Sequence, residues 1–195
     1  MARPSEKRNR LVFAAKELIH KHGYKQTSLA DIAKSSNVPL GNVYYYFRTK
    51  QDIALAVVSL HREEFTQSIE ELNGSTESPL QRVFHYITGL YKDRTILERH
   101  GCPLAKLCME VGNDQTPLSE AVKKINQDIR DWYVKQLEEC GVKDSTIVAD
   151  EILVTTQGAA LISATFSDRT IFQNQIDRLL AHLRDLVGTH LVYEK

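Results

Sequence analysis

The stretch from Thr27 to Lys50 reads TSLADIAKSSNVPLGNVYYYFRTK and predicts two short helices joined by a tight turn. Ser28 is followed three residues later by Asp31, the spacing of a capping box, so the first helix is expected to begin there. The SSN run that follows breaks this helix, because its side chains compete for backbone hydrogen bonds. Pro39, whose backbone angle is fixed, opens the second helix. A helix, a short turn and a second helix form the geometry that places a helix in a DNA major groove.

The aromatic and apolar residues of the second helix are expected to divide between a small core and a contact surface. Val43 and Phe47 lie four residues apart, so both are predicted to pack inward against the first helix. The three tyrosines before Phe47 cannot all face the same way. Tyr45 and Tyr46 are the stronger candidates for exposed contacts, whereas both a buried and an exposed Tyr44 fit the pattern.

The rest of the chain is also helical in pattern, and strand-like alternation is short wherever it occurs. Thr49 and Asp52 form a second capping box, which begins a third and longer helix. Besides the two short helices, the pattern predicts helices over about residues 5–22, 50–72, 79–90, 102–112, 117–141, 145–166 and 172–187. The sequence therefore predicts an all-α protein of about nine helices.

The charge of the chain is unevenly distributed, although Lys plus Arg equal Asp plus Glu at 25 each. Residues 1–60 contain ten Lys and Arg against four Asp and Glu, a net charge of +6, and residues 61–195 carry the opposite charge. A basic amino-terminal part on an acidic body is typical of a chain that meets phosphates at one end. A solvated basic helix would give the same charge, but here the helix-turn-helix pattern lies in the same residues.

The segment from about residue 8 to residue 55 resembles the DNA-binding domain of TetR-family (TetR/AcrR) transcriptional regulators. Pro39 departs from the family, which more often has a capping serine there, so a small adjustment of the turn is expected. The matching residues lie in one register and are Gly23, Tyr24, Thr27, Ser28, Asp31, Ile32, Ala33, Val38, Gly41, Val43, Tyr44, Tyr46, Phe47 and Lys50. The resemblance implies an N-terminal three-helix helix-turn-helix DNA-binding domain at 1–49 and a C-terminal helical ligand-binding and dimerisation domain at 50–195.

The resemblance also implies which residues contact double-stranded DNA. Gly41 has no side chain, so the recognition helix can approach the duplex closely, and Asn42 can hydrogen-bond a base edge or a phosphate. Tyr45 offers a flat ring that can touch a thymine methyl group. The implied DNA-binding set is Thr27, Ser28, Leu40, Gly41, Asn42, Tyr44, Tyr45, Tyr46 and Lys50.

A single helix-turn-helix reads few base pairs, whereas two held about 34 Å apart read a palindromic operator. The chain is therefore expected to form a homodimer, through its last two helices. Small residues on the helix at 145–166 permit close approach of a second helix, although a helix buried at the centre of a monomer would fit the same pattern. The predicted dimerisation residues are Gly158, Leu161, Ile162, Phe166, Ile176, Leu180 and Leu183.

Members of the family usually bind a small molecule in the C-terminal domain and then release DNA. The resemblance therefore implies a small-molecule effector, hydrophobic or electrophilic, and a repressor that it releases from its operator. Apolar residues at helical spacing are also typical of a plain core, so the lining set is a weaker prediction than the pocket itself. The candidate ligand-binding residues are Tyr86, Leu90, Cys102, Leu104, Met109, Trp132, Tyr133 and Phe166.

Cys102 allows several interpretations. It stands in the sequence HGCP at the expected start of a helix, where a thiolate is favoured. Some TetR relatives with a cysteine at a similar place, such as the electrophile sensor NemR, respond to electrophiles, which makes a NemR-like redox-sensing subgroup an alternative. The more common alternative is a buried small hydrophobic residue. A thiol-dependent enzyme that uses Cys102 with His100 or His85 is less favoured, because no Cys-x-x-Cys and no nucleophile elbow occur.

Several classes of protein are disfavoured by composition. Three cysteines do not suggest a secreted disulfide framework, and no signal peptide precedes the first helix. The longest uncharged run, Ile152 to Ser167, is semi-polar and shorter than the ~18 residues of a spanning helix. His100, Cys102 and Cys108 lack the paired spacing of a zinc site. We therefore expect a cytoplasmic regulator with no membrane association, no catalytic residues, no metal and no cofactor; a helical protein-binding adaptor is the remaining alternative class.

Overall fold

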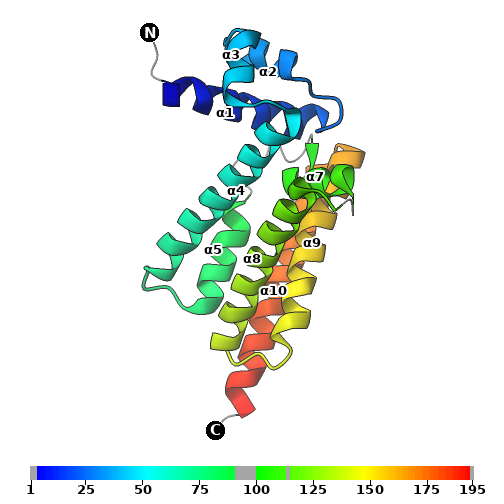
Figure 1. Ribbon diagram of the computed structural model, residues 1–195. Coiled ribbons are helices and arrows are strands. Elements are labelled where there is room, and N and C mark those ends of the chain that lie inside the picture. The colour runs from blue at the N-terminus through cyan, green and yellow to red at the C-terminus, as the bar shows by residue number, and fades with distance from the viewer. Residues whose placement is uncertain (1–3, 91–99, 113–114, 194–195) are drawn as a thin grey trace. The chain divides into compact units, whose positions relative to one another are not determined.

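The computed structural model describes residues 4–90, 100–112 and 115–193. Within these ranges the chain forms nine α-helices and no strand, so the all-α prediction is confirmed (Figure 1). The described residues divide into two compact units, which contain Met1–Glu64 with Pro103–Ile125 and Phe65–Cys102 with Asn126–Lys195. We call these the first and the second unit. The family resemblance implies a division at residue 49 between DNA binding and ligand binding. That division stays a prediction, because the two units are defined by packing contacts and not by function.

The first unit is built on three amino-terminal helices. They are α1 (Pro4–His22), α2 (Leu29–Ser36) and α3 (Leu40–Tyr46). The first part of α4 (Lys50–Asn73), α7 (Pro103–Val111) and the first part of α8 (Pro117–Glu139) complete the unit. Helix α1 packs against both α2 and α7 and so lies between them as a shared packing partner.

Local signals in the sequence set the helix ends of this unit. Both capping boxes are confirmed: Ser28 exchanges hydrogen bonds with Asp31, and Thr49 exchanges them with Asp52 at 2.9 and 3.1 Å. Helix α1 ends at Gly23, whose positive φ of 93° favours glycine. Helix α3 begins at Leu40, one residue later than predicted. Pro39 is its N-cap and supplies no side-chain hydrogen bond, since proline has no polar side-chain atom.

The core of the amino-terminal helices follows the predicted pattern. Val43 and Phe47 are buried, as expected from their spacing. They lie among apolar residues from α1, α2 and the turn, and removing these side chains from water stabilises the unit. The buried apolar residues of α1 to α3 and their turns are Leu11, Val12, Ala14, Ala15, Ile19, Ile32, Ala33, Val38, Val43 and Phe47.

The second unit contains α5 (Pro79–Gly89), α9 (Ser145–Phe166), α10 (Arg169–Tyr193) and the remainders of α4 and α8. Helices α9 and α10 form the largest helix–helix contact in the described chain, and α10 also packs against α5. By length and composition alone α9 is long and apolar enough to cross a membrane, and 39% of its apolar window is buried; a single helix of this kind is weak evidence for a membrane span.

Helix α10 is longer than the predicted range 172–187 at both ends. Ser167 ends α9 in the left-handed conformation, and α10 begins only two residues later at Arg169. Asp168 makes this short connection possible, because its carboxylate accepts the Thr170 N–H at 2.8 Å and its carbonyl accepts the Ser163 hydroxyl at 2.7 Å. Periodicity alone misses such a start, since the first two residues of α10, Arg169 and Thr170, are polar.

Candidate nucleic-acid interface

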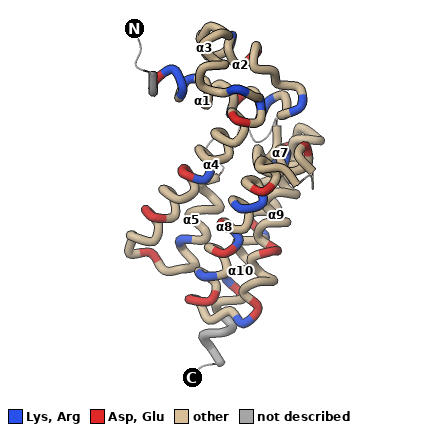
Figure 2. The backbone as a smooth tube through the Cα atoms, viewed as in Figure 1, with Lys and Arg blue, Asp and Glu red and all other residues tan. Residues whose placement is uncertain are grey.

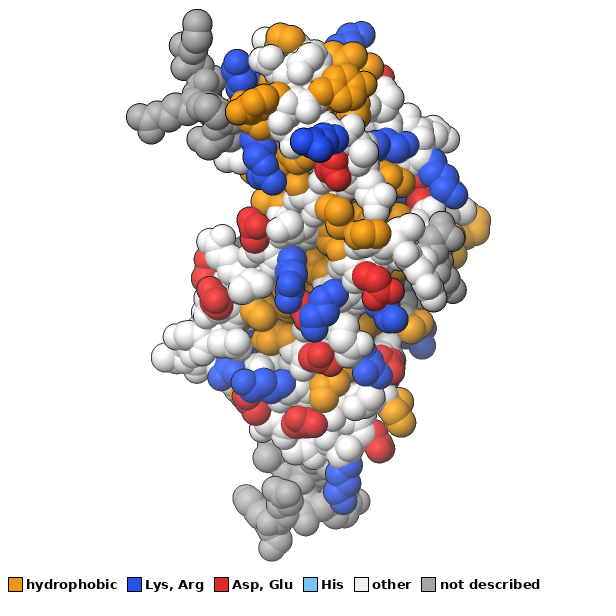
Figure 3. All heavy atoms as spheres, in the orientation of Figure 1, with side chains coloured by type: hydrophobic (Ala, Val, Ile, Leu, Met, Phe, Trp, Pro, Cys, Tyr) orange, Lys and Arg blue, Asp and Glu red, His pale blue; other side chains and the backbone are white. Residues whose placement is uncertain are grey.

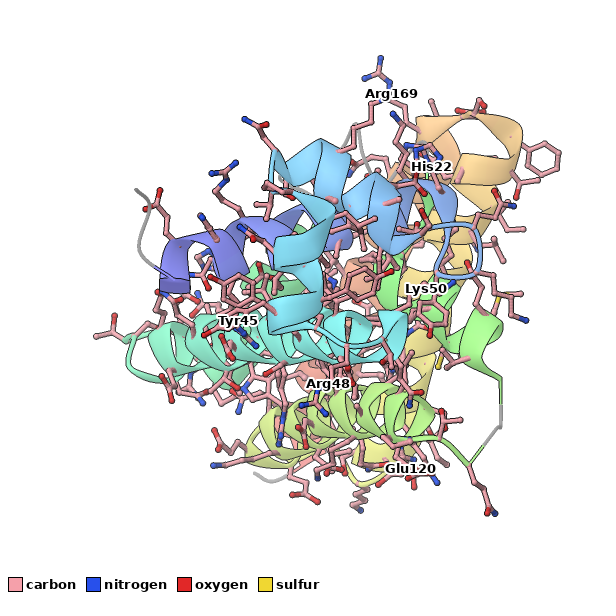
Figure 4. All side chains as sticks on the ribbon, turned by 45° about the horizontal axis from the view of Figure 1, so that its top comes forward. His22, Tyr45, Arg48, Lys50, Glu120 and Arg169 are labelled. Atoms are coloured by element: carbon pink, nitrogen blue, oxygen red, sulfur yellow. The ribbon has the colours of Figure 1, made fainter. Side chains whose placement is uncertain are left out.

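Helix α3 presents an exposed aromatic surface above its buried Val43. Tyr45 is 80% exposed and Tyr44 is 54% exposed. Tyr46 is half-buried, and its ring meets the Tyr45 ring edge-to-face with 5.0 Å between centroids. Tyr44 therefore belongs to the surface, and Tyr46 is the more enclosed of the three. Figure 3 shows hydrophobic side chains with Lys and Arg beside them on this end of the first unit, and Figure 4 labels Tyr45 beside α3.

The start of α3 is open. Leu40 and Gly41 are exposed, and Asn42 is half-buried. A Cβ placed on Gly41 would meet no atom within 4 Å, so the glycine is not required by the packing of the chain itself. The absence of a side chain here thus leaves the helix backbone free to approach another molecule.

Three predicted phosphate contacts, Thr27, Ser28 and Lys50, are engaged inside the unit. Thr27 is buried, and its hydroxyl donates to the Gly23 carbonyl at 2.7 Å. The Lys50 ammonium donates to the carbonyls of Tyr24 and Lys25 at 3.0 and 3.1 Å, and lies 4.6 Å from the centre of the Tyr24 ring. An ammonium has three N–H donors, so these two hydrogen bonds leave one for an outside acceptor. Ser28 is exposed at the N-terminus of α2, where its hydroxyl donates to the Asp31 carboxylate at 2.6 Å and accepts the Asp31 N–H at 3.1 Å.

The structure adds two arginines that sequence analysis did not single out. The Arg10 guanidinium donates to the carbonyls of Ser36 and Asn37, the second at 3.0 Å, so it caps the end of α2 and braces the turn before α3. Arg8 lies over the Phe47 ring at 5.3 Å. Figure 2 shows the Lys and Arg residues on α1. The basic composition pointed to this region, but the partners lie 26 or more residues away and carry no local signal.

An ion pair joins α1 to α4 within the first unit. Glu64 accepts hydrogen bonds from the Lys16 ammonium, one of them at 2.6 Å, and lies 3.5 Å from the His61 ring nitrogen. The hydrogen bond from His61, aided by Lys16, lowers the pKa of Glu64 to about 2. This carboxylate therefore stays charged at neutral pH and holds α1 on the helix that follows the DNA-binding segment.

The candidate ligand-binding residues are split between the two units. Leu104 and Met109 belong to the first unit, where Met109 is 77% exposed. In the second unit, Tyr86, Trp132 and Tyr133 are buried together, with ring centroids 5.2 to 5.9 Å apart. Burial raises the pKa of Tyr86, and the nearby Cys102 thiol adds to the shift. Leu90 and Phe166 are exposed, and Cys102 is half-buried.

The candidate dimerisation residues fall into two groups. On α9, Leu161, Ile162 and Phe166 are exposed and Gly158 is half-buried. On α10, Ile176, Leu180 and Leu183 are buried within the single chain, so they pack in the core of the second unit. Two exposed residues of α9 were missed by sequence analysis: Ile147 and Val154, the second 72% exposed. Their seven-residue spacing with Leu161 was the available signal.

No group of three or more His, Cys, Asp or Glu side chains in the described residues is arranged to hold a metal ion. Burial raises the pKa of the Cys108 and Cys140 thiols, which disfavours their thiolate forms. The first unit presents hydrogen-bonding and charged groups around the exposed helix α3.

Helix α2, a tight turn and the short exposed helix α3 form a helix-turn-helix, the arrangement that many DNA-binding proteins place in the major groove. A family model described as bacterial regulatory proteins, tetR family, matches residues 11–57. A second, described as transcriptional regulator LmrA/YxaF-like, C-terminal domain, matches residues 79–178, about half of the chain. The chain belongs to the TetR family of helix-turn-helix transcriptional regulators, which confirms the predicted resemblance.

Curated relatives cover most of the chain. An uncharacterised helix-turn-helix transcriptional regulator of Lactococcus lactis subsp. lactis is 26% identical over 179 residues, 88% of this chain and 90% of the relative. The transcriptional regulator LmrA of Bacillus subtilis is 25% identical over 169 residues, 85% of this chain and 90% of the relative. The repressor NemR of Escherichia coli is 28% identical over 126 residues, 63% of this chain and 57% of NemR.

Solved structures confirm the fold. A TetR-family regulator from Agrobacterium tumefaciens aligns with a TM-score of 0.81 at 24% identity, and the alignment covers 92% of this chain and 98% of that chain. A TetR regulator from Legionella pneumophila aligns with a TM-score of 0.80 at 21% identity, covering 92% and 96%. At these low identities the two structures show the shared helical fold alone. The roles of individual residues are therefore argued from the geometry of this chain.

Proposed function

We propose that this regulator is a homodimeric repressor that binds a palindromic DNA operator through α3 and is released by a small-molecule effector. The observation that carries the proposal is the exposed surface of α3. Tyr44 and Tyr45 extend from a helix whose opposite side, at Val43, is anchored in the core, and Gly41 leaves its start open. A rigid helix with exposed side chains and an unobstructed start is what major-groove contact requires.

Base reading and phosphate binding are proposed for different residues. Asn42, Tyr44 and Tyr45, with Leu40 and Gly41 beside them, face the base edges, where an amide and phenolic groups can hydrogen-bond and a ring can contact a thymine methyl. Phosphates are bound by Ser28, Tyr46 and the remaining donor of Lys50, which fixes register without reading sequence. Thr27 contributes by holding the turn, because its hydroxyl already donates to Gly23.

Dimerisation is proposed along α9. Ile147, Val154 and Leu161 are exposed and repeat every seven residues, which places them on one face of the helix. Phe166 adds exposed apolar surface at the C-terminal end of the same helix, and Gly158 allows a second helix to approach closely. A symmetric dimer brings the same face of α9 from each protomer together. The buried Ile176, Leu180 and Leu183 support that face from behind, as part of the α9–α10 core.

The effector is proposed to be a small hydrophobic molecule bound beside the aromatic residues Tyr86, Trp132 and Tyr133. Their shared burial gives the second unit an apolar interior, which is the usual lining of a ligand site. An electrophile that acts on Cys102 is the alternative. Alkylation decides between them: if Cys102→Ser still loses DNA on treatment with N-ethylmaleimide as wild type does, Cys102 is not the sensor.

Selection from random duplexes tests the DNA-binding proposal. Purified protein is mixed with a library of randomised duplexes of about 30 bp, long enough for two half-sites one turn apart, and bound DNA is sequenced. A palindrome is expected, together with sedimentation as a dimer at micromolar concentration. Enrichment of no sequence, or a monomer at that concentration, would refute the proposal. Cytoplasmic localisation without membrane association is proposed with it, since the operator lies on DNA.

A further inference from the structure

Helix α7 places a cationic side chain on the end of α1. The Lys106 ammonium donates to the carbonyls of His20 and Lys21, at 3.0 and 3.3 Å. Both carbonyls lie in the last turn of α1, where the helix supplies no N–H partner. A positive charge is favourable there, because the carbonyl end of a helix carries partial negative charge. Lys106 therefore acts as a C-terminal cap of α1, supplied from a helix far along the chain.

One turn further along α7, an acidic side chain binds the loop that follows α1. The Glu110 carboxylate accepts the backbone N–H of Lys25 at 2.6 Å. A Cβ built on Gly23 would lie 2.3 Å from the same carboxylate, so a larger residue here would displace the end of the Glu110 side chain. Gly23 also has a φ of +93°, which strains other residues. The backbone conformation therefore favours glycine, and its small size leaves the Glu110 carboxylate in place beside the loop.

The same short segment is bound from a second direction by the DNA-binding side of the unit. Lys50 donates to the carbonyls of Tyr24 and Lys25 and stacks on the Tyr24 ring. The Lys25 residue therefore has its N–H bonded to Glu110 and its C=O bonded to Lys50. A displacement of α7 that carries Glu110 moves the residue that orients Lys50.

We propose that Lys106 and Glu110 are positioning residues for DNA binding, which hold residues 20–25 so that Lys50 is oriented toward the phosphates. The proposal rests on the DNA-binding function above and adds to it that α7 controls this surface through two polar contacts. Neither side chain has to touch DNA.

The sign of the effect at Glu110 separates this role from simple electrostatics. Removing an acid near a DNA-binding surface reduces repulsion of phosphates and by charge alone strengthens binding. Loss of the hydrogen bond to Lys25 predicts the opposite. We therefore compare Glu110→Met with Glu120→Met, a matched change at an exposed residue of α8 in the same unit.

The probe is the duplex that wild-type protein enriches from the random library, measured by fluorescence anisotropy over a series of salt concentrations. We expect Glu110→Met to bind about tenfold more weakly than Glu120→Met, as for loss of a charge-assisted hydrogen bond. The slope of log Kd against log salt is expected to fall by up to about one charge, as for Lys50→Ala, because Lys50 is no longer held toward its phosphate. Glu110→Gln retains an acceptor for the Lys25 N–H and is expected to recover most of the affinity.

Each outcome has one meaning. If wild type enriches no duplex, the DNA-binding function itself fails. If wild type binds and Glu110→Met behaves like Glu120→Met, the function stands and the positioning role is overturned. If Glu110→Met does not fold by circular dichroism, Lys106→Met is compared with Lys123→Met, an exposed α8 lysine of the same unit, and with Lys106→Arg. Loss of affinity in Lys106→Met alone, restored by arginine, supports the role; equal affinity of all three overturns it.

Discussion

Lys50 and Tyr24 are joined by two contacts in the first unit: the ammonium nitrogen lies 4.6 Å from the centre of the Tyr24 ring and donates to the Tyr24 carbonyl at 3.0 Å. A cation held over an aromatic face and bonded to a carbonyl is restricted to few positions. Lys50 is thus oriented before it meets DNA, and little side-chain freedom remains to be lost on binding. The predictions below follow from this and related contacts.

Lys50→Ala is expected to weaken binding to all DNA sequences and to reduce the slope of log Kd against log salt by about one charge. The physical reason is that its remaining N–H donor is proposed to bind a phosphate, which carries no sequence information. Anisotropy titrations with the selected duplex and with a scrambled duplex check this. Lys135→Ala, an exposed change in the second unit, is the control. A salt slope as steep as that of wild type would contradict the prediction.

Tyr45→Ala and Asn42→Ala are expected to change sequence preference as well as affinity. Tyr45 is the most exposed aromatic residue of α3 and contributes little to the core, so its loss should leave the fold intact. Each lost base contact is worth about 1–3 kcal/mol of discrimination. Repeating the random-library selection with each variant measures the preference, and Tyr45→Phe separates the ring from the hydroxyl. Equal loss on selected and scrambled duplexes would argue against base reading.

Val154→Glu is expected to convert the dimer to a monomer. Val154 lies at the centre of the exposed α9 face, and a charge brought into a closely packed apolar interface would be buried without a partner. Analytical ultracentrifugation at micromolar concentration measures the change. Thr146→Glu, at another exposed position on α9, is the control and should remain dimeric. A dimeric Val154→Glu protein would place the dimer contact elsewhere.

Glu64→Gln is expected to lower the free energy of unfolding at neutral pH by at most about 1 kcal/mol, because the ion pair between Glu64 and Lys16 is partly exposed. The folded pKa of Glu64 is about 2, below its ordinary value of 4.5. The charged form therefore stabilises the fold above pH 4.5, and this contribution is lost as pH falls toward 2. Melting curves of wild type and Glu64→Gln should accordingly converge as pH is lowered through this window. A constant difference would contradict the prediction.

The sequence predicted most of the first unit because its signals are local. The capping boxes at Ser28 and Thr49 each act over three residues, and the apolar spacing of Val43 and Phe47 identifies the buried side of α3. The exposure of Tyr44 was not decided by pattern, since adjacent helix positions differ by about 100° and either side was possible. The packing of α3 on α2 resolved it.

Longer-range features were outside the reach of pattern. Periodicity correctly identified Ile176, Leu180 and Leu183 as apolar-face residues, but it cannot distinguish a face that packs within the chain from one that packs on a second copy. The same limit applies to the aromatic residues of the second unit, since Tyr86 and Trp132 meet only because α5 and α8 pack together.

The sequence alone determined where the helices are capped, which side of each helix is apolar and which part of the chain is basic. Each of these features depends only on residues that are close together in the chain. The contacts of Lys106 and Glu110 with His20 and Lys25 were decided only by tertiary structure, since they join residues 85 or 86 positions apart. A hydrogen bond of that span forms only where buried apolar surfaces have already brought α1 and α7 together.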